Sequence, residues 1–297
     1  MKKTAFIAIV GRPNVGKSTL MNALLGEKVV IVSSKPQTTR NRIMGVLTKD
    51  ENQFVFLDTP GIHKPKTKLG NYMMKSVRSS MGSADAVILI ADAGRAPGMV
   101  EQNVVNQIKE AGLPAILVLN KLDLYNREQL AKTIEQYAAL YAFDAFVPVS
   151  ALKEKNVDVV LEEAEKFLYP SDWMFEEDML TDQPERQIAA EFIREKMLRS
   201  LSEEIPHGAA VVIEEFKETD KLISIRAEIF CERESHKGII VGKGGQTLKM
   251  IGSRAREDLE NFFGMKVYLN LWVKVKENWR DSDFNLHNFG YNPKNLE

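Results

Sequence analysis

The residues best suited to chemistry form a phosphate-binding pattern near the N-terminus, Gly11-Arg-Pro-Asn-Val-Gly-Lys-Ser18. They match the P-loop pattern G-x-x-x-x-G-K-[S/T] at every fixed position. They follow an apolar run, Ala5–Val10, and precede an expected helix, Ser18–Leu25. Backbone N–H groups at a helix N-terminus attract anions, so this loop can wrap the phosphates of a nucleotide. Lys17 adds positive charge near the β- and γ-phosphates, and the Ser18 hydroxyl can bind Mg²⁺.

A second motif, Asp58-Thr-Pro-Gly61, follows the apolar run Phe54–Leu57. A carboxylate at the end of a strand can hold Mg²⁺ through a water molecule. The N–H of Gly61 can bond a γ-phosphate only while that phosphate is present. This motif therefore predicts a site that distinguishes a nucleoside triphosphate from a diphosphate.

Two further motifs indicate that the base is guanine. In Asn120-Lys-Leu-Asp123, the Asp123 carboxylate is placed to accept two hydrogen bonds from the N1–H and 2-amino groups of guanine. Adenine has neither donor, and sites built this way discriminate by roughly 10⁴ or more. Backbone N–H groups of Ser150-Ala-Leu152 can bond the guanine O6, while Asn120 and Lys121 brace the base pocket.

These motifs need a scaffold that brings the ends of strands together. Nearly continuous apolar runs are typical of strands buried on both faces of a parallel sheet. Four such runs follow the first one, at Phe54–Leu57, Ala86–Ala91, Ala115–Leu119 and Phe146–Val149. Amphipathic stretches between them, at Met99–Ala111 and Glu128–Leu140, predict helices. This alternation predicts a doubly wound α/β domain with a mostly parallel sheet, whose ligands bind at the carboxyl ends of the strands.

The pattern changes after Leu168, and a smaller α+β domain is expected beyond a linker. Its predicted order is α-β-β-α-α-β, with Gly242-Lys-Gly-Gly245 between the two adjacent helices. The predicted boundaries are a nucleotide-binding domain at 1–169, a linker at 170–184, the second domain at 185–280 and a C-terminal tail at 281–297. Trp279, Asn285–Asn288 and the Phe289-Gly-Tyr tail are expected to be disordered.

Composition narrows the class of protein. The 297 residues are 44% hydrophobic and 27% charged, with a net charge of -1, as in ordinary globular proteins. A single cysteine, Cys231, excludes a disulfide within the chain. No signal peptide and no membrane-spanning run are expected, which makes the cytoplasm the default compartment. Residues 237–280 hold nine basic against four acidic side chains, and this block suggests a polyanionic partner.

Taken together, the motifs resemble those of the bacterial Era family of translation-factor-class GTPases, over essentially the full length. The resemblance also includes Pro36-Gln-Thr-Thr-Arg-Asn-Arg42, which is similar to switch I, and Ile62 after Gly61. The second domain is similar to a type II KH domain. The resemblance implies GTP hydrolysis coupled to binding of 16S ribosomal RNA near its 3′ end, in assembly of the small (30S) ribosomal subunit. It also implies peripheral contact with the inner face of the cell membrane, with no DNA partner and a monomeric state.

The resemblance assigns roles at the nucleotide site. Lys17, Asn14, Thr39 and Gly61 are expected to act in hydrolysis. Ser18, Thr39 and Asp58 are expected to hold Mg²⁺, Asp58 through water, and Thr38 is the alternative to Thr39. The residues expected to bind GTP or GDP are Gly11, Arg12, Pro13, Asn14, Val15, Gly16, Lys17, Ser18, Thr19, Asp58, Thr59, Pro60, Gly61, Ile62, Asn120, Lys121, Leu122, Asp123, Ser150, Ala151 and Leu152.

Ile62 departs from Ras-like GTPases, which carry a water-orienting glutamine at this place. Isoleucine has no donor or acceptor, so slow intrinsic hydrolysis is predicted. In related GTPases with the same P-loop, an asparagine at the place of Asn14 helps to hold K⁺, which supplies positive charge. The alternative is that Asn14 only closes the loop by bonding its own backbone.

KH domains clamp about four single-stranded nucleotides with a G-x-x-G loop. Here that loop joins two helices in the basic block, and Lys243 adds charge. Ile240, Val241 and Leu248 are candidates for an apolar floor beneath the bases, with core packing as the alternative role of each. The residues expected to contact RNA are Lys237, Ile240, Val241, Gly242, Lys243, Gly244, Gly245, Leu248, Lys249, Arg254 and Arg256.

Other function classes remain beside the GTPase switch. A GTP-dependent scaffold or a membrane-associated cell-cycle switch, each with little turnover, is the alternative that Ile62 leaves open. A metabolic enzyme that uses a P-loop for phosphoryl transfer is disfavoured, because the Asn120–Asp123 motif selects guanine.

Overall fold

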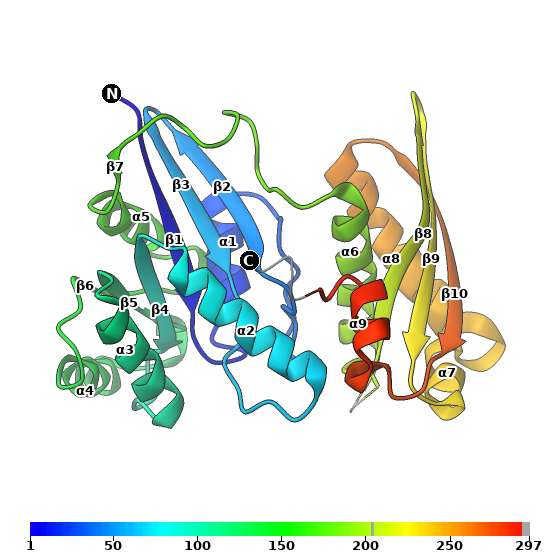
Figure 1. The fold of residues 1–297 in the computed structure, drawn as a ribbon, viewed down its shortest axis with the longest axis horizontal. Coiled ribbons are helices and arrows are strands. Elements are labelled where there is room, and N and C mark those ends of the chain that lie inside the picture. Colours follow the sequence, from blue (N-terminus) through cyan, green and yellow to red (C-terminus); the bar gives the residue numbers. More distant parts are fainter. Residues whose placement is uncertain (203–204, 293–297) are drawn as a thin grey trace. The chain divides into compact units, whose positions relative to one another are not determined.

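The chain folds into two compact units, seen in a computed structural model that describes residues 1–202 and 205–292 (Figure 1). Unit 1 consists of Met1–Lys64 and Met73–Asp182. Unit 2 consists of Pro65–Tyr72 and Gln183–Asn292. The predicted linker therefore crosses the division between the units.

Unit 1 is built on one sheet with the strand order β2-β3-β1-β4-β5-β6. Strands β3, β1, β4, β5 and β6 run parallel, β2 is antiparallel to β3 at the edge, and β7 pairs antiparallel with β1. The strands are β1 (Lys3–Val10), β2 (Ile43–Lys49), β3 (Asn52–Asp58), β4 (Ala86–Asp92), β5 (Ala115–Asn120), β6 (Ala145–Pro148) and β7 (Tyr169–Pro170). The predicted doubly wound, mostly parallel fold is confirmed, but the prediction missed β2.

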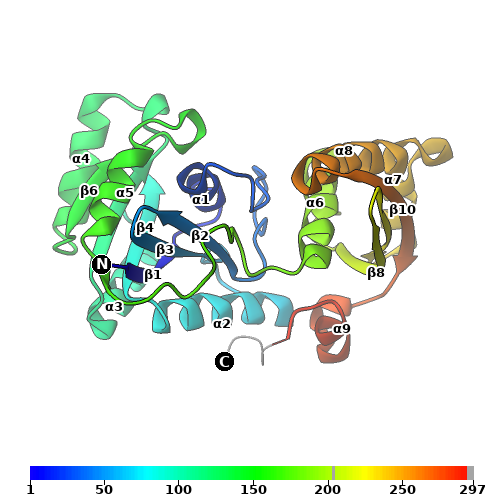
Figure 2. The same ribbon diagram turned by 90° about the horizontal axis from the view of Figure 1, so that it is seen from above.

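Helices cover both faces of this sheet (Figure 2). Helices α1 and α5 pack on one face, and α2, α3 and α4 pack on the other. The helices are α1 (Lys17–Leu25), α2 (Lys68–Gly82), α3 (Met99–Ala111), α4 (Arg127–Ala138) and α5 (Val157–Glu165), with 3₁₀ turns η1 (Leu122–Leu124) and η2 (Ala151–Lys153). This arrangement buries both faces of the central strands, which explains their continuous apolar runs.

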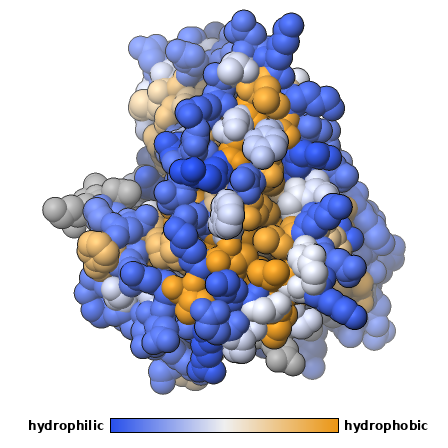
Figure 3. Space-filling view, turned by 90° about the vertical axis from the view of Figure 1, so that its right-hand side faces the viewer, coloured by the Kyte–Doolittle hydropathy of each residue, from blue (hydrophilic) through white to orange (hydrophobic). Residues whose placement is uncertain are grey.

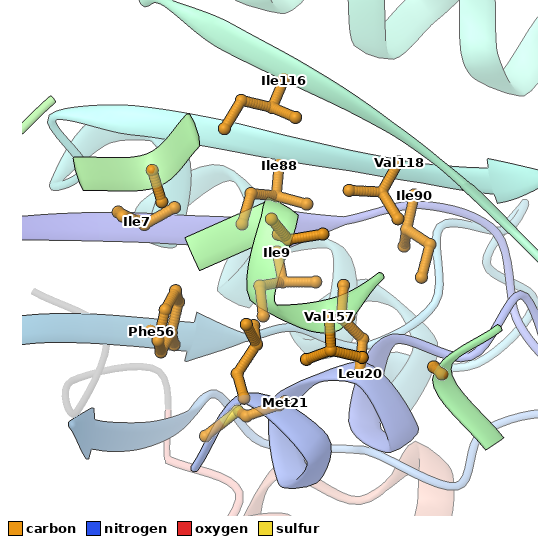
Figure 4. Packing of buried hydrophobic residues seen from close by; sticks show 14 of the residues in the cluster. Ile7, Ile9, Leu20, Met21, Phe56, Ile88, Ile90, Ile116, Val118 and Val157 are labelled. Atoms are coloured by element: carbon orange, nitrogen blue, oxygen red, sulfur yellow. The ribbon is translucent and has the colours of Figure 1, made fainter. Parts of the chain in front are cut away.

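Alternate residues of each strand feed the two cores. Ile7 and Ile9 of β1 pack towards α1 and α5, whereas Ala8 and Val10 pack towards α2, α3 and α4. Figure 4 shows side chains of β1, β3, β4 and β5 gathered with those of α1 and with Val157 of α5. Each large apolar side chain buried in this way contributes about 1.5–3 kcal/mol. The strands are therefore held firmly enough to position the loops at their ends.

The carboxyl ends of the parallel strands carry the predicted motifs. β1 ends at Val10, directly before the P-loop, and β3 ends at Asp58. β5 ends at Asn120, and β6 is followed two residues later by Ser150. Parallel strands have their carboxyl ends at one edge of a sheet, so four motifs that are distant in sequence meet there.

The first part of the predicted linker is packed onto unit 1 and forms an edge segment, residues 171–181. The N–H of Val46 on β2 donates to the carbonyl of Leu180 at 2.9 Å. The Gln53 side chain on β3 accepts from the N–H groups of Met174 (2.9 Å) and Phe175 (3.1 Å). The ring of Phe175 covers a cluster of apolar side chains on β2 and β3. This stretch has no helical or strand period because its contacts are to other elements.

Unit 2 has the predicted order of elements, with one three-stranded sheet in the order β10-β9-β8. β8 is antiparallel to β9, and β10 is parallel to it. Helices α6, α7 and α8 pack against this sheet (Figure 1). The elements are α6 (Glu185–Ser200), β8 (Ala210–Thr219), β9 (Leu222–Cys231), α7 (Glu234–Val241), the 3₁₀ turn η3 (Lys243–Gly245), α8 (Gln246–Phe263) and β10 (Lys266–Val275).

The chain after β10 is folded as far as it is described, so the expected disorder of Trp279, of Asn285–Asn288 and of Phe289–Tyr291 is wrong. A 3₁₀ turn, η4 (Trp279–Asp281), and a helix, α9 (Asp283–Asn288), follow β10. The Trp279 indole is fully buried, and its Nε1–H donates to the carbonyl of Gly208 at 2.9 Å. Phe289 stacks on Phe230 of β9 and contacts the Trp279 ring. Residues 293–297 lie outside the described residues.

The burial of Trp279 predicts a large effect on stability. Trp279→Ala should lower the free energy of unfolding of unit 2 by about 3–5 kcal/mol, because a large buried side chain leaves a cavity. The matched control is Trp272→Ala, since Trp272 is 56% exposed and should contribute less than about 1 kcal/mol. Urea unfolding followed by circular dichroism measures both, and equal losses would contradict the burial of Trp279.

Candidate functional site

A cavity of about 490 Å³ lies at the carboxyl edge of the sheet in unit 1. All four predicted motifs and the switch I segment contribute to its walls. The predicted residues that line it are Pro13, Asn14, Gly16, Lys17, Ser18, Thr19, Thr39, Gly61, Asn120, Lys121, Asp123, Ser150 and Leu152. The fold therefore brings the phosphate-binding and base-binding residues around one space.

Nine predicted residues do not line this cavity, and the prediction missed five residues that do. The predicted residues that do not line it are Gly11, Arg12, Val15, Asp58, Thr59, Pro60, Ile62, Leu122 and Ala151. The lining residues that the prediction lacked are Val32, Ser33, Ser34, Gln37 and Leu124, besides the alternative Thr38. Leu124 could have been found, because it directly follows the guanine motif, whereas residues 32–34 match no motif.

Three backbone positions of the P-loop have positive φ: Gly11, at 155°, and two positions further along the loop. Asn14 has φ 63° and Gly16 has φ 102°. A Cβ atom at Gly16 would lie 2.2 Å from Nδ2 of Asn120, so only glycine fits there. α1 begins at the next residue, Lys17, which places its N-terminal N–H groups at the cavity.

The Asn120 side chain ties three loops together. Its Nδ2–H donates to the carbonyl of Val15 in the P-loop at 2.8 Å. Its Oδ1 accepts from the N–H of Ala151 at 2.9 Å. Because both bonds are buried, this side chain holds the phosphate end and the base end of the cavity in a fixed relation.

At the base end, the Asp123 carboxylate is held by two neighbours. Its Oδ1 accepts from the Ser150 hydroxyl at 2.6 Å, and its Oδ2 lies 3.5 Å from Nζ of Lys153. The Ser150 hydrogen bond is the main cause that lowers the pKa of Asp123, with a smaller contribution from Lys153. The carboxylate is therefore ionised and oriented to accept hydrogen bonds from a base.

At the phosphate end, three oxygen atoms converge. The Ser18 hydroxyl donates to Oδ2 of Asp58 at 2.8 Å, and the Thr39 hydroxyl donates to the same oxygen at 3.1 Å. Oδ1 of Asp58 is buried without a hydrogen-bond partner among the described residues. Burial raises the pKa of Asp58, while Lys17 opposes that shift. Oxygen donors with one orphaned carboxylate atom fit a hard cation such as Mg²⁺.

The two candidate threonines of switch I have different neighbours. Thr39 lies 2.9 Å from the Ser18 hydroxyl, within the converging oxygens. The Thr38 hydroxyl instead donates to the carbonyl of Lys35 at 2.6 Å. The arrangement favours Thr39 over Thr38 as the Mg²⁺ ligand.

Lys17 is buried against the P-loop backbone. Its ammonium group donates to the carbonyls of Arg12 at 2.9 Å and Gly11 at 3.3 Å. Burial lowers its pKa to about 8, although the nearby Asp58 opposes the shift. A bound phosphate would restore a full counter-charge to this ammonium group.

The segment after Asp58 lies against the P-loop. A Cβ atom at Gly61 would come within 2.7 Å of the backbone of Pro13, so glycine allows this close approach. The N–H of Ile62 donates to the carbonyl of Gly11 at 3.1 Å. The Ile62 side chain packs against the core formed with α2, α3 and α4. Ile62 is thus placed for packing and does not line the cavity.

In unit 2, a groove of about 390 Å³ runs between α8 and β10. Its walls combine the end of the Gly-rich loop with apolar and basic side chains. The lining residues are Gly245, Leu248, Lys249, Gly252, Ser253, Arg256, Val267, Tyr268, Leu269 and Leu271. Figure 3 faces this side of unit 2 and shows a stripe of hydrophobic side chains bordered by hydrophilic ones.

The Gly-rich loop has three positive φ values, 73° at Gly242, 58° at Gly244 and 80° at Gly245. A Cβ atom at Gly242 would lie 2.2 Å from the Thr247 hydroxyl, whereas Gly244 and Gly245 face open space. The backbone at the last two positions is therefore open to the close approach of a ligand.

Four of the predicted RNA-contact residues line the groove, and seven do not. Leu248, Lys249 and Arg256 line the groove with Gly245. Ile240 is fully buried, which favours the alternative of core packing over contact with RNA. The other predicted residues, Lys237, Val241, Gly242, Lys243, Gly244 and Arg254, do not line the groove itself. The β10 residues of the groove were missed, although their alternation placed Val267, Leu269 and Leu271 on one face.

Comparison with known families matches each unit separately. Residues 6–121 match the family model of the 50S ribosome-binding GTPases, and residues 204–280 match that of the KH domain. Among the described residues, no helix is both long and apolar enough to cross a membrane.

Curated relatives match along the whole chain. "GTPase Era" of Ruminiclostridium cellulolyticum is 49% identical over 290 residues, which are 97% of each chain. "GTPase Era" of Clostridium botulinum is 50% identical over 298 residues, which cover all of both chains.

Two solved structures have the same fold throughout. One is the crystal structure of Era in complex with MgGDPNP and nucleotides 1506–1542 of 16S ribosomal RNA, with a TM-score of 0.94, 42% identity, and coverage of 98% of this chain and 99% of that chain. The other is a single-residue variant of Aquifex aeolicus Era bound to GDP.AlF4⁻, with a TM-score of 0.93, 42% identity, and coverage of 97% and 99%.

The lowered pKa of Lys17 predicts a pH dependence of nucleotide binding. Bound phosphates favour the charged lysine, and the free protein loses that proton as the pH rises through about 8. The affinity for GDP should therefore fall by about twofold from pH 7 to 8 and by about fivefold between pH 8 and 9. Calorimetry in buffers of different ionisation enthalpy should detect proton uptake on binding at pH 9 and almost none at pH 7. A flat affinity without proton uptake would contradict the assignment.

Proposed function

Because this chain belongs to the Era family of GTPases, we propose that it is a GTP-driven switch that binds the 3′ end of 16S ribosomal RNA in assembly of the small ribosomal subunit. It binds GTP and GDP and hydrolyses GTP. The observation that carries the RNA proposal is the groove between α8 and β10, which joins an apolar floor to an open Gly-rich loop in a chain whose other unit is a GTPase. We also propose the domain boundaries that the sequence predicts: a GTPase domain at 1–169, a linker at 170–184, an RNA-binding domain at 185–280 and a C-terminal tail at 281–297.

The chemistry of the groove suits single-stranded RNA. Leu248, Leu269 and Leu271 offer apolar surface to bases, while Lys249 and Arg256 offer positive charge to phosphates. The open glycines allow the sugar–phosphate backbone to approach the main chain. A relative that is 42% identical over almost the full length was solved with a fragment of 16S ribosomal RNA, which supports the same class of partner here.

In the proposed mechanism, Ser18, Thr39 and Asp58 hold Mg²⁺, with Asp58 acting through water. The ion, when bound, neutralises charge on the β- and γ-phosphates. Lys17 binds the same phosphates, and Asp123 orients guanine from the other end of the cavity. Gly61 lines the same cavity, and in this mechanism its N–H binds the γ-phosphate only while that phosphate is present.

We propose that intrinsic hydrolysis is slow and that K⁺ accelerates it. Ile62 packs into the core and carries no group that can orient water. Asn14 lines the cavity on the P-loop, with its backbone at φ 63°. A cation held there would place positive charge beside the phosphates, where charge accumulates in the transition state. Contact with the inner face of the cell membrane stays a prediction from the family resemblance.

The K⁺ proposal predicts that GTP hydrolysis is at least about tenfold faster in KCl than in NaCl at equal ionic strength. Asn14→Gly should remove this difference, because glycine accepts the positive φ but supplies no oxygen ligand. Release of phosphate under saturating GTP is the measurement. Equal rates of the parent protein in the two salts would sink the idea.

The RNA proposal predicts that Lys243→Asp combined with Gly244→Asp abolishes binding of a single-stranded fragment from the 3′ end of 16S ribosomal RNA. Two carboxylates would repel the phosphates at the open loop. The affinity for GTP should stay the same, since the cavity lies in unit 1. Lys221→Asp, at an exposed lysine of the same unit, is the control. Fluorescence anisotropy measures both ligands, and an unchanged RNA affinity of the double variant would refute the assignment.

A further inference from the structure

The P-loop is fastened from behind by an ion pair with α3. The Arg12 guanidinium donates through Nε and Nη2 to the two carboxylate oxygens of Glu101, with Nη2 at 2.8 Å from Oε2. The Glu101 side chain is only 5% exposed, and its Oε2 also accepts from the N–H of Gly98 at 2.9 Å. We refer to Arg12, Glu101 and Gly98 as the P-loop clamp.

The absence of a side chain at Gly98 is part of this geometry. A Cβ atom there would lie 2.4 Å from Nη2 of Arg12, so glycine leaves the space that the guanidinium fills. Gly98 has φ −103°, which any residue can adopt, so the reason for glycine is this contact and not backbone strain. The clamp therefore has a steric component besides its charges.

The carboxylate of the clamp is held in its charged form. Burial by itself raises the pKa of Glu101, but the hydrogen bonds from Arg12 and Gly98 outweigh it and bring the pKa below its usual value. Arg12 is drawn towards α3, whose own residues Val104 and Ile108 are buried in the core. The clamp thus joins the P-loop to a rigid element.

The backbone of residues 11–13 contacts the residues that are expected to bind the γ-phosphate. The carbonyl of Arg12 accepts from Lys17, and the carbonyl of Gly11 accepts from Ile62. The backbone of Pro13 is in close contact with Gly61. Residues 11–13 are therefore the surface on which the segment that detects the γ-phosphate rests, while the N–H groups that cradle the other phosphates come from residues further along the loop.

We infer that Glu101 is a positioning residue for GTP hydrolysis, which acts through Arg12 to set the backbone of residues 11–13 against Gly61. It touches neither the nucleotide cavity nor the reacting atoms. The inference depends on the GTPase activity and is independent of RNA binding. Loss of the clamp should impair the γ-phosphate-dependent step more than the binding of GDP.

The test compares the turnover number for GTP with the dissociation constant for GDP in clamp variants. Glu101→Gln should lower kcat by about tenfold or more, since a displacement of about 1 Å near reacting groups can cost up to 10²-fold. The dissociation constant for GDP should change by less than about threefold. Glu110→Gln is the control, because Glu110 is an exposed carboxylate on the same helix, and its kcat should equal that of the parent.

A second variant keeps the test decisive if the half-buried Arg12 without its partner prevents folding. Gly98→Ala retains both charges and the backbone N–H, but it displaces the guanidinium, so it should lower kcat in the same selective way. In the cycle of Arg12→Met, Glu101→Gln and the double variant, the double variant should lose little more than either single one. A kcat within about twofold of the parent in Gly98→Ala, or multiplicative losses in the double variant, would overturn the inference.

Discussion

The nucleotide site depends on two hydrogen bonds that are made by the carboxamide of Asn120. It donates to the P-loop and accepts from the Ser150 loop, and this pair of bonds requires a side chain with both a donor and an acceptor. It fits only because Gly16 leaves the space beside it. The strands β1, β5 and β6 supply the three loops at one edge of the sheet, so the apolar cores on both faces determine how well this single side chain can hold them together.

The pKa shifts at the phosphate end of the cavity are those expected of a site that binds charged ligands. Burial opposes the charged form of both Lys17 and Asp58, lowering one pKa and raising the other. Each group is only partly compensated by protein neighbours, and the orphaned oxygen of Asp58 is the clearest sign. A nucleotide with its cation supplies the missing opposite charges, so ligand binding and the protonation of this pair are linked.

The motifs and most of the helices and strands could be predicted from the sequence, because each motif is a local run that follows a buried strand. The parallel topology of the sheet then brings the ends of these strands together. β2 was missed because Ile43–Lys49 has neither a long apolar run nor clear alternation. Its neighbours are β3 and residues from far along the chain. Trp279 was misjudged for a similar reason, because its burial depends on a distant partner, Gly208, which no local pattern records.

The edge segment, residues 171–181, affects whether the sheet of unit 1 can pair with a strand of another chain. An edge strand exposes unpaired N–H and C=O groups that can recruit a strand of another molecule. β2 is such a strand, yet Val46 is already bonded to Leu180, and Phe175 covers the apolar side chains beside it. The stretch that leads to unit 2 thus also covers the edge strand β2 and opposes edge-to-edge association. A chain cut just after β7 would leave that edge open.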